Sequence, residues 1–234
     1  MSGPVRFFQG QITLDGPSGT GKSSVARAVA ARLGAAYLDT GAMYRAATVA
    51  VLDAGVDPED ADAVAAVVAN ARIEVGTTAG AEVVKVDGVD VADRIRGPLV
   101  TRTVSPVSAV PAVRRRLVDQ QRALVAAAEA VVVEGRDIGT VVLPEATLKV
   151  YLTADPAVRA ERRAAQLGIT EPAEIAELAD DLRRRDEYDS GRADSPLRPA
   201  DDAVIVDSTH LDRAAVIDRV VELAATAVGA GERA

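Results

Sequence analysis

Several chemically reactive side chains are absent or rare in this 234-residue chain, which has no cysteine and a single histidine, His210. Without cysteine, the chain cannot form disulfides, use thiol catalysis or build cysteine-based zinc sites. One histidine also excludes a histidine-cluster metal site, and we interpret His210 as a loop residue without a role. The chemistry of an active site must therefore come from hydroxyl, carboxylate, lysine, arginine and backbone groups.

Basic residues are fewer than acidic residues, with 27 Lys and Arg against 35 Asp and Glu. The net charge is -8, and Lys22, Lys85 and Lys149 are the only lysines, so almost every other cation is an arginine. Proteins that coat nucleic acid or lie on a membrane surface need a broad basic face. We therefore expect neither nucleic acid nor a membrane as partner, although a locally basic pocket remains compatible with this balance.

Aromatic residues make up 3% of the chain, and tryptophan is absent. The core must be built from Val, Leu, Ile and Ala, which is common where parallel strands are buried on both faces. No apolar run approaches the length of a membrane span, and the N-terminal stretch "MSGPVRFFQGQITLD" lacks the pattern of a secretory signal. These observations favour a cytoplasmic protein.

Strand-like runs alternate with helical patterns along most of the chain. The expected strands cover residues 11–15, 35–39, 130–135, 147–152 and 203–208. This alternation predicts an α/β fold, a single domain over residues 1–234 with a parallel sheet and helices on both faces. In such sheets ligands bind at the carboxyl ends of the strands, so motifs that directly follow a strand carry the most weight.

Residues 72–95 differ, because "RIEVG", "EVVKVDG" and "VDVADRI" alternate in polarity around turn signals. They predict a small antiparallel three-stranded lobe, inserted at about residues 70–104. A polar, arginine-rich stretch follows from about Arg159 to Arg198.

Helix starts are predicted from capping signals. We expect Asp57 to cap a helix that Pro58 opens, and Asp155–Pro156 to open another. Thr209 with Asp212 predicts a capping box for the last helix.

A glycine-rich loop directly follows the first strand and precedes a helical pattern. It matches G-x-x-x-x-G-K-[ST] at Gly16, Pro17, Ser18, Gly19, Thr20, Gly21, Lys22 and Ser23. In this pattern backbone N–H groups converge on a phosphate, and the positive end of the following helix points at the same place. The lysine reaches the outer phosphates and the final hydroxyl binds Mg²⁺. The motif therefore predicts a nucleoside-triphosphate site but not the group that receives the phosphate.

Other residues narrow the choice of acceptor. No N-K-x-D element follows a strand, which argues against a regulatory GTPase. "VVVEGRD" offers Glu134 as the acidic residue of a mechanical ATPase, but Arg136 and Asp137 follow it closely. Arginines such as Arg45 and Arg136 lie just past predicted strands, where they would neutralise two anionic substrates.

Taken together, several segments resemble the bacterial cytidylate kinases. They are "ITLDGPSGTGKSSVARAVAARLGAAYLDTGAMYRA", the lobe, "EGRDIGTVVLPEATLKVYLTADPAVRAERR" and "RRDEYDSGRADSPLRPADDAVIVDST". The resemblance implies a P-loop nucleoside-monophosphate-kinase fold with a core, a monophosphate-binding lobe and a lid at about residues 160–198. It implies transfer of the γ-phosphoryl group of ATP to CMP or dCMP, with Mg²⁺ as cofactor.

The resemblance also implies roles for individual residues. Gly16 to Ser24 would hold ATP, with Lys22 as a catalytic residue and Ser23 as the metal ligand. Thr40, Arg45 and Arg136 would hold the acceptor phosphate or its neighbourhood. The cytosine would be read by Ser105, Arg114 and Asp137. The ribose and phosphates would be held by Arg185, Asp189 and Arg192, and the transferring group would be covered by Arg162 and Arg163.

Some of these assignments have alternatives. Cytosine presents an amino donor that a carboxylate accepts, so Asp137 would favour cytosine over uracil. Asp137 is also compatible with a pair to Arg136 or with help in holding Mg²⁺. Asp189, expected in a mobile loop, is also compatible with a plain surface aspartate.

Two other functions fit the motif set less closely. One is a related small-molecule kinase that acts on UMP, AMP or a hydroxyl-bearing metabolite. The other is a nucleotide-dependent switch or assembly ATPase. Because the lobe lacks an obvious apolar, self-complementary face, we expect a monomer.

Overall fold

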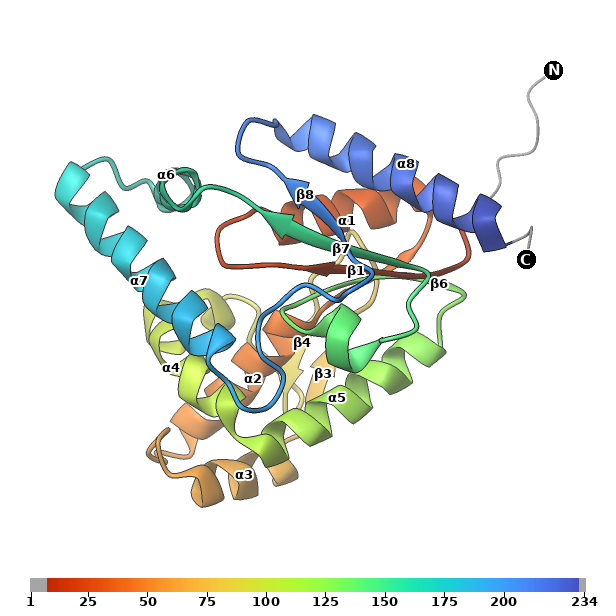
Figure 1. Ribbon diagram of the computed structural model, residues 1–234. Coiled ribbons are helices and arrows are strands. Elements are labelled where there is room, and N and C mark those ends of the chain that lie inside the picture. Colours follow the sequence, from red (N-terminus) through yellow and green to blue (C-terminus); the bar gives the residue numbers. More distant parts are fainter. Residues whose placement is uncertain (1–7, 232–234) are drawn as a thin grey trace.

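A sheet of five parallel strands forms the centre of the chain (Figure 1). The structure is a computed structural model that describes residues 8–231. The expectation that the N-terminus carries no secretory signal falls partly on residues 1–7, which lie outside the described residues. In spatial order the strands are β2 (Ala36–Asp39), β6 (Ala130–Glu134), β1 (Gly10–Asp15), β7 (Leu148–Thr153) and β8 (Val204–Asp207). The predicted parallel sheet is confirmed.

The register of this sheet brings acidic strand ends together. Glu134, the last residue of β6, lies opposite both Leu14 of β1 and Asp39 of β2. The middle strands are almost fully buried and consist largely of Val, Ile and Leu, as expected for a parallel sheet that is covered on both faces.

Helices cover both faces of the sheet, as predicted (Figure 1). On one face, α1 (Lys22–Leu33) and α8 (Arg213–Gly231) share a core with the strands through side chains such as Val29 and Val220. On the other face lie α2 (Thr40–Asp53) and α5 (Pro111–Ala126), and their buried side chains form a second core. Outside this layer are α3 (Ala61–Asn70) and α4 (Pro98–Ala109).

The inserted segment folds as the predicted antiparallel sheet. Its strands are β3 (Ile73–Val75), β4 (Val84–Val86) and β5 (Val89–Asp90). The turn between β4 and β5 has positive φ at Asp87 (51°) and Gly88 (82°), which is the geometry that the "DG" signal predicts. Ile73, Val84 and Val86 are buried in the same core as α2, so this sheet is attached through its apolar side.

Two predicted helix starts are wrong. Asp60, not Asp57, caps α3 and accepts a hydrogen bond from the Ala63 N–H at 3.0 Å, because Asp57 instead stabilises a tight turn by accepting from Glu59. No Thr209 capping box forms before α8. Asp212 accepts from the Ala215 N–H there, since the Thr209 hydroxyl is engaged by Asp207.

The arginine-rich stretch forms two helices that pack against each other, α6 (Pro156–Leu167) and α7 (Pro172–Ser190) (Figure 1). Asp155 caps α6 and Pro156 occupies its first turn, as predicted. Asp189 lies on α7 and is buried, so its interpretation as a surface aspartate in a loop is wrong. Within residues 8–231, no helix is both long and apolar enough to cross a membrane.

Candidate active site

A cleft of about 1070 Å³ lies at the carboxyl edge of the large sheet. Its walls come from the glycine-rich loop, from α2, α4 and α5, and from α6 and α7. Most of the residues predicted from the sequence line it: Ser18, Gly19, Gly21, Lys22, Ser23, Ser24, Thr40, Arg45, Ser105, Arg114, Arg136, Asp137, Arg163, Arg185, Asp189 and Arg192. The fold therefore gathers residues that are up to 174 positions apart in the sequence (Ser18 to Arg192).

The glycine-rich loop between β1 and α1 is held tightly. Gly16 has φ +145°, and a Cβ there would lie 2.0 Å from the Leu152 carbonyl oxygen of β7, so only glycine fits. The Thr20 hydroxyl and the Lys22 ammonium both donate to the Pro17 carbonyl, at 3.2 and 2.7 Å. Burial lowers the pKa of Lys22, and the nearby Arg136 guanidinium lowers it further. A bound phosphate would reverse this effect by pairing with the charged form.

Glu134 lies beside Ser23 of this loop and is absent from the predicted site set. Its carboxylate accepts from the Ser23 hydroxyl at 2.9 Å, and the Tyr37 hydroxyl donates to its other oxygen. Burial raises the pKa of Glu134, as does the nearby Asp39. A hydroxyl beside a carboxylate is a hard oxygen donor set, which suits Mg²⁺ held together with substrate phosphates. The signal for this residue was its place at the end of a buried strand.

Three arginines that line the cleft have no carboxylate partner among residues 8–231. Among the described residues, Arg45, Arg163 and Arg185 form no ion pair, and their pKa values are lowered by burial and by neighbouring arginines. For Arg45, burial and then Arg185 lower the pKa to about 10. Partly buried cations that repel one another are stabilised when an anion binds between them. This part of the cleft is therefore suited to phosphate groups.

A buried ion pair lies at the far end of the cleft. Arg114 of α5 donates to the Asp137 carboxylate, and each side chain is 5% exposed. Arg114 also donates to the Ser108 carbonyl at 3.1 Å and lies over the Tyr44 ring. Asp137 thus pairs with Arg114 rather than with Arg136, the partner considered from the sequence.

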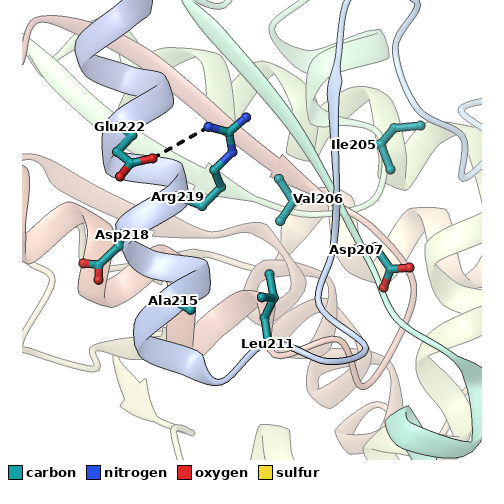
Figure 2. Close-up of a pocket in the computed structure, with 8 residues that line it drawn as sticks. All are labelled: Ile205, Val206, Asp207, Leu211, Ala215, Asp218, Arg219 and Glu222. Carbon is teal, nitrogen blue, oxygen red and sulfur yellow. Dashed lines mark ion pairs between the residues drawn. The ribbon is translucent and has the colours of Figure 1, made fainter.

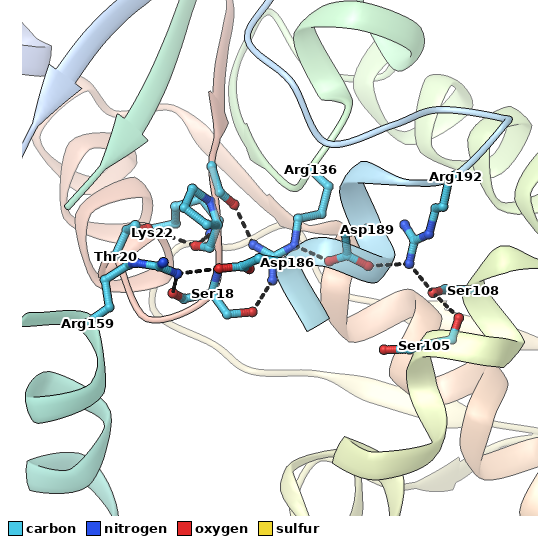
Figure 3. A network of polar contacts seen from close by, with 12 residues as sticks. Ser18, Thr20, Lys22, Ser105, Ser108, Arg136, Arg159, Asp186, Asp189 and Arg192 are labelled. Carbon is cyan, nitrogen blue, oxygen red and sulfur yellow. Dashed lines mark hydrogen bonds and ion pairs between the residues drawn. The ribbon is translucent and has the colours of Figure 1, made fainter. Parts of the chain in front are cut away.

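A chain of polar contacts runs across the cleft from the glycine-rich loop to Ser108 of α4 (Figure 3). Arg136 donates to the Gly16 carbonyl, to the Ser18 hydroxyl and, at 3.0 Å, to the Asp189 carboxylate. Asp189 also accepts from Arg192, which donates to the Ser108 hydroxyl at 2.8 Å. Thr40, at the start of α2, donates to the Glu134 carbonyl at 2.7 Å. One network therefore links the glycine-rich loop to α4 and α7.

Arg162 is not brought into the cleft with the other predicted residues. It donates to the Ser208 hydroxyl at 2.9 Å and to the Ser208 carbonyl at 2.6 Å, on the far side of α6. Successive helical residues diverge by about 100°, so Arg162 cannot share the face of Arg163. The residue one turn before Arg163 does share it: Arg159, which was not predicted, contacts Ser18 and Asp186.

A second cavity, of about 530 Å³, lies between β8 and α8 (Figure 2). It is lined by side chains such as Ile205, Leu211 and Asp218, and its one arginine, Arg219, pairs with Glu222 at 3.7 Å. None of the predicted site residues lies there, so it is separate from the cleft.

A glycine-rich loop between the central strand of a five-stranded parallel sheet and its helix, facing an arginine-lined cleft, defines the P-loop kinase class. A solved gluconokinase from Sinorhizobium meliloti shares this fold, with a TM-score of 0.52, 18% identity, and coverage of 94% of each chain. The sequence model of the family described as cytidylate kinase matches residues 12–226. The chain belongs to the cytidylate kinase family.

Named relatives agree over nearly the whole chain. The cytidylate kinase of Rhodococcus opacus (strain B4) is 53% identical over 222 residues, which cover 94% of this chain and 97% of that protein. The cytidylate kinase of Nocardia farcinica (strain IFM 10152) is 54% identical, with 94% and 95% coverage.

Proposed function

We propose that this protein transfers the γ-phosphoryl group of ATP to CMP or dCMP, giving ADP and CDP or dCDP, with Mg²⁺. The observation that carries the proposal is the set of groups that share one cleft. The triphosphate loop lies at one end and the Arg114–Asp137 pair lies beside Ser108 at the other (Figure 3), and three arginines that form no ion pair within the described residues line the same cleft. The names of the relatives point to the same acceptor.

On the donor side, the loop from Gly16 to Ser24 would bind the triphosphate through backbone N–H groups other than that of Ser18, which donates to Asp186. Lys22 would pair with the outer phosphates and neutralise charge that develops during transfer. The Ser23 hydroxyl and the Glu134 carboxylate, whose oxygens lie 2.9 Å apart, would hold Mg²⁺. When bound, the ion supplies positive charge to the phosphate oxygens.

On the acceptor side, the residues divide by the part of the nucleotide they would bind. Thr40, Arg45, Arg136 and Arg185 would hold the phosphate, and Asp189 and Arg192 the ribose and phosphates. The base would be read by Ser105, Arg114 and Asp137. A buried carboxylate next to Arg114 accepts the cytosine amino group but would repel the uracil 4-oxygen.

The transfer itself needs position and charge more than a base. The transition state of phosphoryl transfer is loose, with charge spread over the equatorial oxygens. Arg136 and Arg163 would join Lys22 in stabilising it. Water must be kept out, because it would otherwise accept the phosphoryl group from ATP.

We assign the exclusion of water to a lid of about residues 160–198 and a lobe of about residues 70–104, both within one kinase domain of residues 1–234. Both segments contribute residues to the cleft, such as Arg163 and Arg96, which supports their closure over it. We further propose a monomer, since the apolar side of the lobe is covered by α2. A cytoplasmic location is proposed from where ATP and CMP occur.

The test is a panel of acceptors. Wild-type protein is incubated with ATP, Mg²⁺ and, separately, CMP, dCMP, UMP, AMP or GMP, and ADP formation is measured. We expect CMP or dCMP to give a kcat/KM at least about a hundredfold above AMP and GMP, because a buried polar pair left unmatched costs roughly 1–3 kcal/mol for each group.

Lys22→Ala protein serves as the control, since activity that persists in it comes from a contaminant. Equal rates with all acceptors would contradict the choice of base. ADP formation that does not depend on any acceptor would instead support an ATPase, and would overturn the proposal.

A further inference from the structure

Ser18, in the glycine-rich loop, has all its polar groups engaged by other elements (Figure 3). Its N–H donates to the Asp186 carboxylate at 3.0 Å, its carbonyl accepts from Arg159 at 3.0 Å, and its hydroxyl accepts from Arg136. Arg159 comes from α6 and Asp186 from α7, so both lid helices hold one residue of the donor loop. The loop amides bind phosphate only when the backbone is held in place.

Arg159 and Asp186 also bind each other. The Arg159 guanidinium donates to Asp186, and their side chains are only 10% and 15% exposed. Gly19 of the loop packs closely on α6, because a Cβ on Gly19 would lie 3.0 Å from the Arg159 carbonyl oxygen. The loop, α6 and α7 thus meet at one buried contact, which neither the family resemblance nor the sequence motifs assigned.

Asp186 and Asp189 project from the same face of α7, three residues apart. Asp186 holds the donor loop, while Asp189 holds Arg136 and Arg192 on the acceptor side. If α7 moves when a ligand binds at Asp189, Asp186 must move with it, because both lie on one rigid helix. Arg136 reinforces this link, because it contacts both Ser18 and Asp189.

We propose that Asp186 and Arg159 are positioning residues that couple the two substrate sites. A nucleoside monophosphate on Asp189 and Arg136 fixes α7, which places Asp186 on the Ser18 N–H and prepares the loop for the triphosphate. By linkage, a bound triphosphate tightens monophosphate binding by the same factor. This inference rests on the proposed function, since it takes the monophosphate to bind beside Asp189.

Isothermal titration calorimetry measures directly the factor by which one substrate tightens the binding of the other. The dissociation constant of a non-hydrolysable ATP analogue with Mg²⁺ is determined with and without saturating CMP. We expect CMP to tighten analogue binding at least about fivefold in the wild type, at the low end of usual coupling. In Asp186→Asn the ratio should fall below about twofold.

Asp181→Asn is the matched control, because Asp181 lies on the same helix but pairs with Arg184 at the surface. It should keep the wild-type ratio. Arg159→Lys retains the charge but loses the guanidinium that contacts both Ser18 and Asp186, and it should also lower the ratio. It serves as the second variant if Asp186→Asn does not fold. A merely destabilised protein would keep the ratio, since both dissociation constants would change together.

The outcomes separate the two proposals. If the wild type phosphorylates CMP but Asp186→Asn and Arg159→Lys keep its coupling ratio, the coupling is wrong and the proposed function stands. The same holds if the wild type itself shows no coupling. If the wild type does not phosphorylate CMP, the proposed function fails and the coupling fails with it.

Discussion

At the residue scale, Asp15 shows how burial sets the behaviour of a carboxylate. It ends β1 beneath the glycine-rich loop and accepts from the N–H groups of Ile138 and Gly139, at 2.9 and 2.7 Å. Burial raises its pKa to about 6 in spite of these two hydrogen bonds. The folded protein therefore keeps Asp15 largely protonated below about pH 6, where the unfolded chain has already ionised it.

Asp15 should consequently make stability depend on pH. Because the pKa is higher in the folded than in the unfolded chain, the folded state binds more protons and stability falls as pH rises toward 6. Between pH 4.5 and 7 this group alone should lower the free energy of unfolding by about 2 kcal/mol. In Asp15→Asn this contribution disappears.

Urea denaturation at several pH values checks this expectation. The difference in unfolding free energy, Asp15→Asn minus wild type, should rise with pH over that range. A difference that stays constant with pH would contradict the raised pKa, whatever the overall loss of stability in the variant.

Other residues could be assigned from the sequence only when a motif fixed their neighbours. Lys22 and Ser23 follow from the spacing of the loop, whose chemistry is local. Glu134 has a strand end as its signal, and Asp186 lies in the segment "RRDEYDSGR" of the resemblance without a role of its own. Their importance comes from contacts with Ser23 and Ser18, which are 111 and 168 positions away.

At the scale of elements, α6 begins at a capping residue and carries two functional arginines. Arg159 contacts the donor loop, and Arg163 lines the cleft. Asp155 caps it by accepting from the Ala157 N–H at 2.8 Å, and Arg159 and Arg163 follow on its inner face. Fraying of the first turn would loosen the segment that holds Arg159 on the donor loop.

We expect Asp155→Ala to lower the free energy of unfolding by about 1 kcal/mol, because the cap hydrogen bond is lost. Denaturant unfolding followed by circular dichroism measures this change. Glu161→Ala, at an exposed position of the same helix, is the control and should change stability by less than about 0.5 kcal/mol. An equal loss in both variants would show that the cap contributes nothing specific.

Helix starts were harder to predict than strands for a physical reason. A buried strand is marked by every residue along it, whereas a helix start depends on one capping side chain. Near α3 the sequence offers Asp57 and Asp60, and near α8 Thr209 and Asp212. In each case the earlier residue is used by a local turn, so the later one is left to cap the helix.

At the scale of the whole molecule, the cleft joins two binding sites that should stabilise the fold separately. A ligand that binds only the folded state stabilises it by about 2.7 kcal/mol at a hundred times its dissociation constant. For a chain of this size, that corresponds to a rise in Tm of roughly 5–10 °C.

Thermal unfolding of Lys22→Ala separates the sites. With a non-hydrolysable ATP analogue and Mg²⁺, the wild type should show this rise and the variant should lose most of it, since the outer phosphates lose their lysine. The CMP-induced rise should persist in both proteins. An unchanged analogue response in the variant would contradict the donor site, and a lost CMP response would point to a misfolded variant.

The parallel sheet, the antiparallel lobe and the donor loop could all be predicted from the sequence. Each of these is set by local patterns: strand burial by runs of Val and Ile, the hairpin by Asp87 and Gly88, and the loop by residue spacing. Which charged side chains meet could be seen only once the helices were packed in three dimensions. It turned Arg162 away from the cleft, paired Asp137 with Arg114 and placed Asp186 on Ser18. Pairing depends on how helices pack and rotate against one another, which no short stretch of sequence encodes.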